Sequence, residues 1–469
     1  MGFRYSSPYT QVVLVAFICF CCPGMFNAIN GLGAAGQADA TAQDNAGTAL
    51  AVTFTIFSLI GGAVYNIIGH YVIIPAAFTY VLYIGSYLTP NTGFTVFTGA
   101  LLGVGAGFLW TAQGELISIR VLSAIMMSYP REQDKGKYFA TFWMIFNLGA
   151  TIGGVVPLAK EWNNDTSSVS IVTYIVFMVI MSLGGLLAIA LLPPRKVHHD
   201  DGTPVSIHRF SNWQREAIEA FKLFGDWRML CLIPLFGGSN WFYTYQFNCY
   251  NGGGYFNIRA RALNNVLYWL FQIIGAGIFG NFLDWKAAGS RPKRAWLGLI
   301  TTVVSVMAVW GAALSVQLKY DRARGTFLKQ SGNSALQQDV TGGAYAGELI
   351  IYALFGAVDA IYQGYCYWLM GALTNDTEKA SRFGAFYKTI QNAFAAVAGQ
   401  VDAHKVEYIT ELGISWGLCV VGCIFAIPVV NSVADTTEEI VTNVDGADEL
   451  KVIGGRVESE SGVPDKNLV

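Results

Sequence analysis

Long apolar stretches alternate with short polar connections along most of the chain. A helix needs roughly twenty apolar residues to cross the hydrocarbon core of a bilayer. Twelve stretches approach or exceed that length, at 10–32, 48–68, 71–88, 93–117, 138–158, 169–192, 228–250, 261–283, 295–316, 345–371, 383–403 and 411–431. The pattern predicts an all-α integral membrane protein with twelve transmembrane helices.

Composition supports this prediction. The chain is 53% hydrophobic and only 13% charged, whereas soluble domains carry about 25% charged residues. Aromatic residues make up 14% of the chain, which suits a protein with aromatic belts at both membrane interfaces. The net charge of −2 and the lack of a large basic cluster argue against a nucleic-acid partner. The lipid bilayer is therefore the first partner we expect.

The residues that commonly carry chemistry form no recognisable catalytic or metal-binding motif. The eight cysteines lie in or beside apolar stretches, and the five histidines include no HExxH pair. No glycine-rich phosphate loop follows a strand pattern. We therefore expect no cofactor, no metal site and no enzymatic activity, and any transport would not be driven directly by ATP.

The distribution of Lys and Arg predicts the orientation. If the N-terminus is cytosolic, most basic residues of the connections also fall on the cytosolic side, as the positive-inside rule requires. Both termini are then cytosolic, and the sequon that begins at Asn164 lies on the opposite side, where it would be glycosylated. The plasma membrane and a vacuolar or endosomal membrane are equally compatible with this pattern.

The spans fall into two sets of six on either side of the polar stretch 193–227. Placing "KYFATFWMIFNLGATIGG" (137–154) over "RFGAFYKTIQNAFAAVAG" (382–399) aligns Asn147 with Asn392 without a gap. Two parallel six-helix repeats are the pattern of major facilitator transporters. The predicted organisation is an N-terminal half, a cytosolic linker, a C-terminal half and an acidic, disordered cytosolic tail, at 1–192, 193–227, 228–431 and 432–469.

A loop in the second half resembles a gating motif. "GNFLDWKAAGSRPKR" places Gly280, Asp284, Gly289 and Arg291 as in the G-x-x-x-D…G-R-K/R motif of the major facilitator superfamily. That resemblance implies that Gly280 allows close helix approach. It also implies that Asp284 caps a neighbouring helix or pairs with a cation to lock a cytosolic gate. The alternative is an ordinary charged cytosolic loop.

Several strings are similar to one branch of that superfamily. "YWLMGALTND", "SRFGAFYKTIQNAFAAVAGQVD" and "KGKYFATFWMIFNLGATIGG" resemble the UNC93-like family, over most of 10–430. The stretch 115–124 departs from the family pattern because it separates two motifs that family members join almost directly. The family includes ion-channel regulators and chaperones of membrane proteins, so the resemblance implies the fold more than the activity.

One acidic residue interrupts an otherwise apolar span. Asp359 lies near the middle of 345–371, with Gln363 one helical turn later. A charge at the bilayer centre costs roughly 2.5–3.5 kcal/mol, so we expect Asp359 to face the interior of the bundle. Lys388 and Asn392 belong to a polar stripe in 383–403. Asp359 either binds a cation or proton coupled to a solute or forms half of a buried ion pair.

Amides elsewhere are candidates for lining the same pathway. They are Asn27 and Asn30 in the first span, Asn147 in the fifth and Gln246 in the seventh. Hydrogen bonding between helices is the competing explanation for each. The leading hypothesis is a secondary transporter of a small solute or cation that works by alternating access. The alternative is a regulator or trafficking adaptor of another membrane protein, which does not itself transport.

Overall fold

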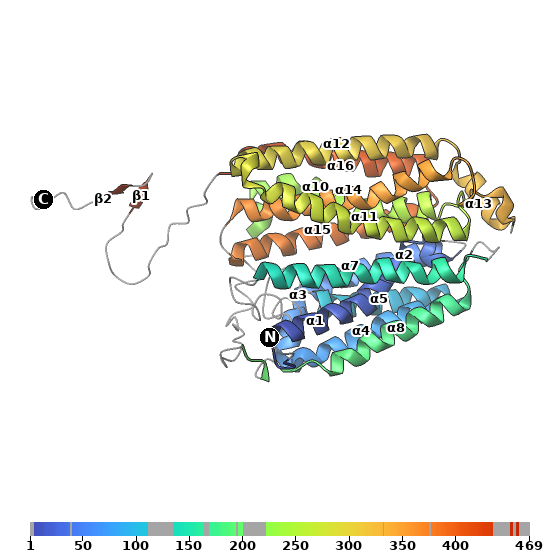
Figure 1. Cartoon of the computed structure of the whole chain (residues 1–469), viewed down its shortest axis with the longest axis horizontal. Coiled ribbons are helices and arrows are strands. Elements are labelled where there is room, and N and C mark those ends of the chain that lie inside the picture. Colours follow the sequence, from blue (N-terminus) through green and yellow to red (C-terminus); the bar gives the residue numbers. More distant parts are fainter. Residues whose placement is uncertain are drawn as a thin grey trace, which may run out of the picture.

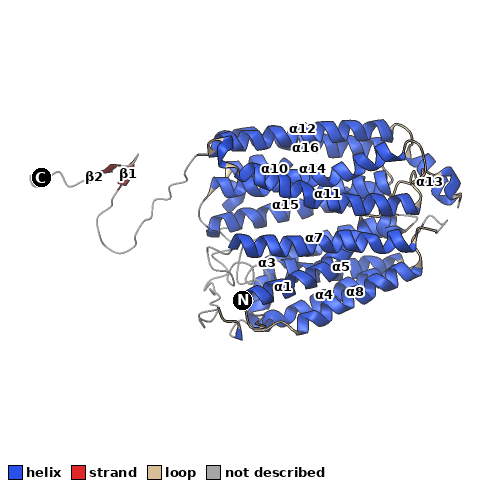
Figure 2. Cartoon of the chain, in the orientation of Figure 1, coloured by secondary structure: helices blue, strands red, loops and turns tan. Residues whose placement is uncertain are grey.

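The computed structural model describes residues 4–37, 40–110, 135–163, 168–193, 196–199, 222–331, 333–374, 377–434, 451–453 and 456–458. Helices make up almost all of these residues and run side by side through one bundle (Figure 2). The described residues form the all-α membrane bundle that the sequence predicted. By length and apolar composition, eight helices within the described part of the chain qualify as membrane spans.

The first half of the chain forms six membrane helices. The first is α1 (Pro8–Cys19), which continues through a wider π-helical turn η1 (Phe20–Gly24) into α2 (Met25–Asn30). Pro23 lies in this turn and lacks the amide hydrogen of a regular helix. After the short turn η2 (Ala34–Gly36) come α3 (Thr41–Ile68), η3 (Gly69–Val72) with α4 (Ile73–Ser86), α5 (Thr92–Trp110), α7 (Lys135–Lys160) and α8 (Ile171–Ile189).

The second half repeats this arrangement. After the turn η6 (Leu223–Gly225) it contains α10 (Trp227–Tyr243) with the π-helical η7 (Thr244–Asn251), α11 (Ile258–Asp284), η8 (Lys286–Ala288), α12 (Arg291–Gln317), α14 (Tyr345–Leu373), α15 (Thr377–Ala403) and α16 (Tyr408–Asn431). The connection between α12 and α14 holds a short helix α13 (Arg322–Gln330) and the turn η9 (Ser334–Leu336). A hairpin of β1 (Lys451–Ile453) and β2 (Arg456–Glu458) follows, pairing Val452 with Val457, where we predicted no strand.

The bundle has two distinct ends. The start of α1 and the end of α16 lie at one end, which we call the terminal face, and α13 lies at the other, the distal face (Figure 1). The helices of the first half lie together on one side of the bundle, and those of the second half lie on the other (Figure 1). This layout agrees with the two six-helix repeats that the sequence predicted.

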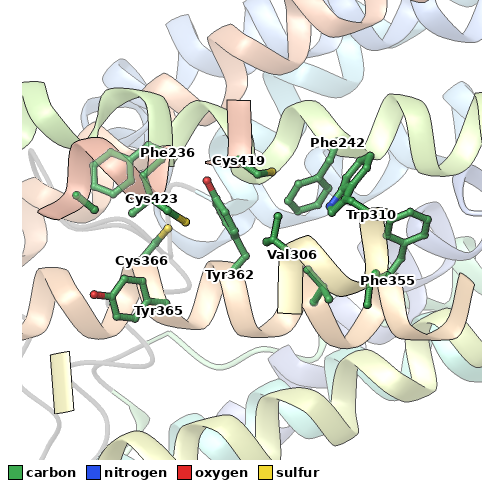
Figure 3. Packing of buried hydrophobic residues seen from close by; sticks show 14 of the residues in the cluster. Phe236, Phe242, Val306, Trp310, Phe355, Tyr362, Tyr365, Cys366, Cys419 and Cys423 are labelled. Carbon is green, nitrogen blue, oxygen red and sulfur yellow. The ribbon is translucent and has the colours of Figure 1, made fainter. Parts of the chain in front are cut away.

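Each half buries its own hydrophobic cluster. The cluster of the first half is built mainly from residues between Val12 and Val197, and that of the second half from residues between Leu223 and Val433. Figure 3 shows part of the second cluster, where the sulfur atoms of Cys366 and Cys423 lie among the rings of Phe236, Tyr362 and Tyr365. All eight cysteines are free. Cys366 and Cys423 serve as small apolar packing groups.

Small residues bring α11 and α14 into close contact. A methyl group at Gly275 would lie 3.0 Å from the Cα of Ala357, and one at Gly356 would collide with the carbonyl oxygen of Tyr268. Backbones that approach this closely leave no room for a Cβ, as is common where membrane helices pack. This contact fixes the position of α14, which carries Asp359, against α11.

Candidate functional site

Asp359 is the central residue of the membrane-spanning helix α14, which is 29 residues long. At 1.5 Å of rise per residue, it lies about 21 Å from either end of that helix. Its side chain is fully buried, with an exposed fraction of 0%. The sequence correctly placed this residue in the interior of the protein and far from both aqueous faces.

Four uncharged side chains donate hydrogen bonds to the Asp359 carboxylate. Gln363 Nε2 donates to Oδ1 at 2.6 Å, one turn along the same helix. Tyr243 Oη, Gln272 Nε2 and Tyr268 Oη donate to Oδ2 at 2.8, 2.6 and 3.3 Å. The donors come from α10, α11 and α14, so three helices of the second half converge on one carboxylate.

No cation pairs with Asp359 among the described residues. The ion pairs there involve Asp226, Asp339, Glu348, Asp402 and Glu411 as acids. The buried ion pair that the sequence offered as one explanation of Asp359 is therefore not found. Its carboxylate instead accepts its described hydrogen bonds from neutral donors.

Lys388 reaches this network indirectly. Its Nζ donates to Gln391 Oε1 at 2.8 Å, and Gln391 Nε2 donates to Gln363 Oε1 at 3.1 Å. The ammonium group also lies 5.3 Å from the ring centroid of Tyr387, within range of a cation–π interaction. The predicted polar stripe of α15 therefore connects to Asp359 through two amides.

The predicted amides separate into two groups. Gln246 belongs to the network, because its Oε1 accepts a hydrogen bond from Tyr268 Oη at 2.8 Å. Asn392 does not reach it, since its Nδ2 donates to the carbonyl of Lys388 in its own helix. No hydrogen bond in the described structure joins Asn147, Asn27 or Asn30 to the carboxylate. Asn30 is buried, and its Oδ1 accepts no hydrogen bond there.

The structure changes the interpretation of the predicted gate. A methyl group at Gly280 would meet no described atom within 4 Å, so a close helix approach at this residue is not seen in the described state. Gly289 has φ of +116°, a backbone conformation that strains side-chain-bearing residues. Asp284 is exposed and takes part in no described ion pair, whereas Arg291 is half-buried in the first turn of α12. The end of α11 is held by Arg294, whose Nη1 donates to the carbonyl of Leu283 at 2.8 Å.

Hydrogen bonds between the two halves concentrate at the distal face. Arg261 is an example: it belongs to α11 but donates to the carbonyls of Leu32 and Gly33, at the end of the first span, at 2.8 and 2.7 Å. The other described pairs are Asn248–Ala34, Asn248–Gln43, Asn248–Asp44, Asn251–Gly31, Asn265–Ala28, Tyr352–Gly31, Thr48–Ala396, Gln400–Asn45, Gln400–Thr48 and Lys405–Thr41. The described structure is therefore closed at its distal face.

Buried charged groups surround the centre of this distal contact. Arg322 donates through Nη2 to Asp402 Oδ1 and Glu411 Oε1, each at 2.6 Å. Asn248 Nδ2 donates to Asp402 Oδ2 at 3.1 Å and to Asp44 Oδ1 at 2.7 Å. Asp44 lies in the first half of the chain. Its partners in this cluster all lie in the second half, namely Asn248, Arg322, Asp402 and Glu411. We call Asp44, Asp402, Glu411 and Arg322 the distal charge cluster.

A separate ion pair fixes the loop before α14. Arg259 donates to Asp339 through Nε at 2.8 Å and Nη2 at 2.5 Å, and Asn257 Nδ2 donates to Asp339 Oδ1 at 2.8 Å. Partial burial opposes ionisation of Asp339, but hydrogen bonds from Arg259, Asn257 and Thr341 outweigh it and lower the pKa of this carboxyl below its usual value. Asn257 also caps the first turn of α11, so the pair ties the loop to the start of that helix.

Sequence reasoning missed most of the partners of both sites. Tyr243, Tyr268 and Gln272 were not selected, because aromatic and amide residues are common in membrane helices and only their convergence is informative. The distal charge cluster was also missed. Its signal in the sequence was the presence of Asp44, Asp402 and Glu411 near the ends of apolar stretches, where charged residues are expected in any case.

Comparisons with known proteins agree with this architecture. A family model described as "Ion channel regulatory protein UNC-93" matches residues 44–427. UNC93-like protein 1 of Arabidopsis thaliana is 41% identical over 424 residues, covering 89% of each chain. A UNC93-like protein of Schizosaccharomyces pombe is 39% identical over 443 residues, covering 93% of this chain and 85% of the relative.

Solved structures extend the similarity in fold. The nucleoside transporter NupG (D323A mutant) superposes with a TM-score of 0.60 at 12% identity, covering 90% of this chain and 100% of that one. A D-xylose-proton symporter gives a TM-score of 0.56 at 11% identity, covering 90% and 96%. At such low identity these structures are evidence for the fold alone.

Proposed function

The chain belongs to the UNC-93 family, and from that premise we propose that it is a secondary transporter of a small solute or ion that works by alternating access. In this proposal the two halves rock about a central site, and the described state is the one closed at the distal face. Asp359 carries the step in which a proton or cation is bound and released. Gln363 and Gln246 orient its network, and Lys388 joins it through Gln391.

The observation that carries the proposal is the environment of the Asp359 carboxyl. A fully buried carboxylate with four neutral donors and no paired cation costs substantial desolvation energy. If the side chain were needed only for packing, an amide or an apolar residue would fill the space with a smaller desolvation penalty. A group that takes up and releases a positive charge must remain a carboxyl.

The Gln272 amide can form a hydrogen bond with the Asp359 carboxyl in either of its protonation states. Its Nε2 donates to Asp359 Oδ2, while its buried Oε1 accepts no hydrogen bond in the described structure. If Asp359 takes up a proton, rotation of the amide by half a turn would present Oε1 as an acceptor for the new O–H. The network therefore accommodates both protonation states without moving a helix.

The orientation of the protein completes the proposal. With both termini cytosolic, the terminal face is the cytosolic one and Asn164 lies on the opposite side, outside the described residues. Asp284 is exposed in the described state, and in our proposal it pairs with Arg291 or a neighbouring cation when the cytosolic side closes. A glycosidase-sensitive mobility shift that Asn164→Gln abolishes would establish this orientation, whereas modification at the opposite face would reverse it.

A second function is supported by the family description. The matching model carries the words "ion channel regulatory protein", and a regulator would use the same fold to hold a membrane-protein partner. In that case Asp359 would stabilise the packing of α10, α11 and α14 and bind no ligand. The two functions differ in whether the isolated chain responds to a solute.

The experiment compares purified wild type with Asp359→Asn by thermal unfolding, across pH and against monovalent cations and a panel of metabolites. Glu348→Gln is the matched control, because Glu348 is a second buried carboxyl on α14 whose partner is Lys319. A ligand or proton response that is lost in Asp359→Asn and kept in Glu348→Gln supports transport, and flux into proteoliposomes then follows. A wild type that responds to nothing, with a variant that unfolds early, refutes it and favours the regulator.

A further inference from the structure

The distal charge cluster holds more negative than positive groups. Asp44, Asp402 and Glu411 are each at most 3% exposed; Arg322 pairs with Asp402 and Glu411, and Lys405 acts electrostatically on Asp44. Three ionised carboxylates outnumber the Arg322 guanidinium and the exposed Lys405 ammonium, so at least one negative charge would stay uncompensated. Buried charges of one sign are not tolerated without a counter-charge or a proton.

The oxygen atoms of these acids are not all occupied. Arg322 binds Asp402 Oδ1 and Glu411 Oε1, and Asp402 Oδ2 accepts from Asn248 Nδ2 at 3.1 Å. Glu411 Oε2 accepts only the weak donor Cys249 Sγ, at 3.2 Å. Asp44 Oδ2 is buried and accepts no described hydrogen bond. The Asp44 carboxyl lies within hydrogen-bonding reach of Asp402, and Asn248 Nδ2 donates to both, so two acids meet across one neutral donor.

The spacing of these atoms suits a bound ion. A ligand atom from each of Cys249, Asp402 and Glu411 lies within 4.8 Å of the other two. Ligands held at about 2.0–2.3 Å from one ion are at most about 4.6 Å apart. Only a small inward movement is therefore needed for all three to reach a common centre. Asp44 adjoins this group through Asp402 and Asn248.

We propose that Cys249, Asp402 and Glu411, with Asp44, form a binding site for a divalent transition-metal ion between the two halves of the protein. The ion supplies the missing positive charge, while Arg322 keeps its two ion pairs. On binding, the Cys249 thiol releases its proton to solvent and its sulfur forms the bond to the metal. A thiolate ligand selects zinc, cobalt or iron over calcium and magnesium, which prefer oxygen ligands alone.

The site would also favour one conformation. Asp44 belongs to α3 of the first half, whereas Cys249, Asp402 and Glu411 belong to η7, α15 and α16 of the second. All four ligands can meet only when the distal face is closed, so the metal stabilises that state. This inference does not depend on transport, because a regulator of the same fold would bind the ion equally.

The test titrates untagged, chelator-treated full-length protein with Co²⁺ and compares its thermal unfolding in Zn²⁺, in Ca²⁺ and at acid pH. A cobalt–thiolate bond gives a charge-transfer absorption band in the near ultraviolet, which a carboxylate or histidine site does not. We expect one ion per chain, and an affinity at least about tenfold weaker in Cys249→Ser and in Asp44→Asn. Cys366→Ser and Glu348→Gln are matched controls, since each alters a buried thiol or carboxyl outside the site, and both should keep the wild-type response.

Four results would overturn the proposal. They are the absence of the band, a band that Cys249→Ser retains, equal stabilisation by Ca²⁺ and Zn²⁺, or stabilisation by acid alone with no effect of metal. The last would mean that protons neutralise the cluster. Both test substitutions are nearly isosteric, and Asp44→Asn retains the oxygen that accepts from Asn248, so each variant is expected to fold. Thermal unfolding without metal checks this.

Discussion

Replacing Arg261 with Leu tests whether the distal contact holds the protein closed. Arg261 lies in the first turn of α11, is 2% exposed, and donates to the carbonyls of Leu32 and Gly33 in the other half. These carbonyls follow the C-terminal end of α2, where a cation is also favoured by the helix dipole. Leu fills much of the same volume but donates no hydrogen bond.

The expected effect follows from these two bonds. Hydrogen bonds to charged groups contribute about 1.5–3 kcal/mol each, and a buried acceptor left unsatisfied has a similar cost. When the distal face opens, water can satisfy the freed carbonyls, so we take the lower value for each bond. The closed state then loses about 3 kcal/mol relative to the open state, which raises the open population about 100-fold.

Alkylation of Cys249 measures this population directly. Cys249 is fully buried below the distal contacts, so a maleimide reaches it only when that face opens. Mass spectrometry of purified protein should show Cys249 labelled about 100-fold faster in Arg261→Leu, while the buried Cys366 is unaffected. Arg294→Leu is the matched control, because Arg294 also binds a helix-end carbonyl but within one half and at the terminal face. Equal Cys249 rates in wild type and a folded Arg261→Leu would refute the reasoning.

Three further predictions concern packing and the distal loop. Gly356→Ala should lower stability by about 1–3 kcal/mol, because its methyl group collides with the Tyr268 carbonyl; thermal unfolding measures this. Gly280→Ala should stabilise α11 by about 0.5–1 kcal/mol, since no described atom lies near a methyl group there; a loss of stability would instead support the close helix approach that the sequence predicted. Asp339→Asn should cost about 1 kcal/mol at neutral pH by removing the Arg259 pair. Because the pKa of Asp339 is lowered on folding, its contribution is full above about pH 4 and is lost as the pH falls further, so wild type and variant should converge in acid. A difference that persists unchanged in acid would contradict this assignment.

Much of the fold followed from the sequence. Every predicted span overlaps a described helix, because crossing a bilayer requires a long apolar stretch whose backbone bonds are satisfied within the helix. The fold class was confirmed, and the interior position of Asp359 followed from the cost of placing a charge toward lipid. The π-helical turns η1 and η7 were not predicted, since they depend on packing at Pro23 and around Asn248 rather than on periodicity.

The sequence by itself determined which segments enter the membrane, the family and the single carboxyl at the centre of α14. Only the tertiary structure decided what surrounds that carboxyl, because its donors lie up to 116 positions away in the chain and hydrophobic periodicity does not specify which side chains meet. The distal charge cluster depends on the tertiary structure even more clearly. Asp44 and Asp402 meet only because the two halves close on each other, and no local pattern of residues encodes that contact.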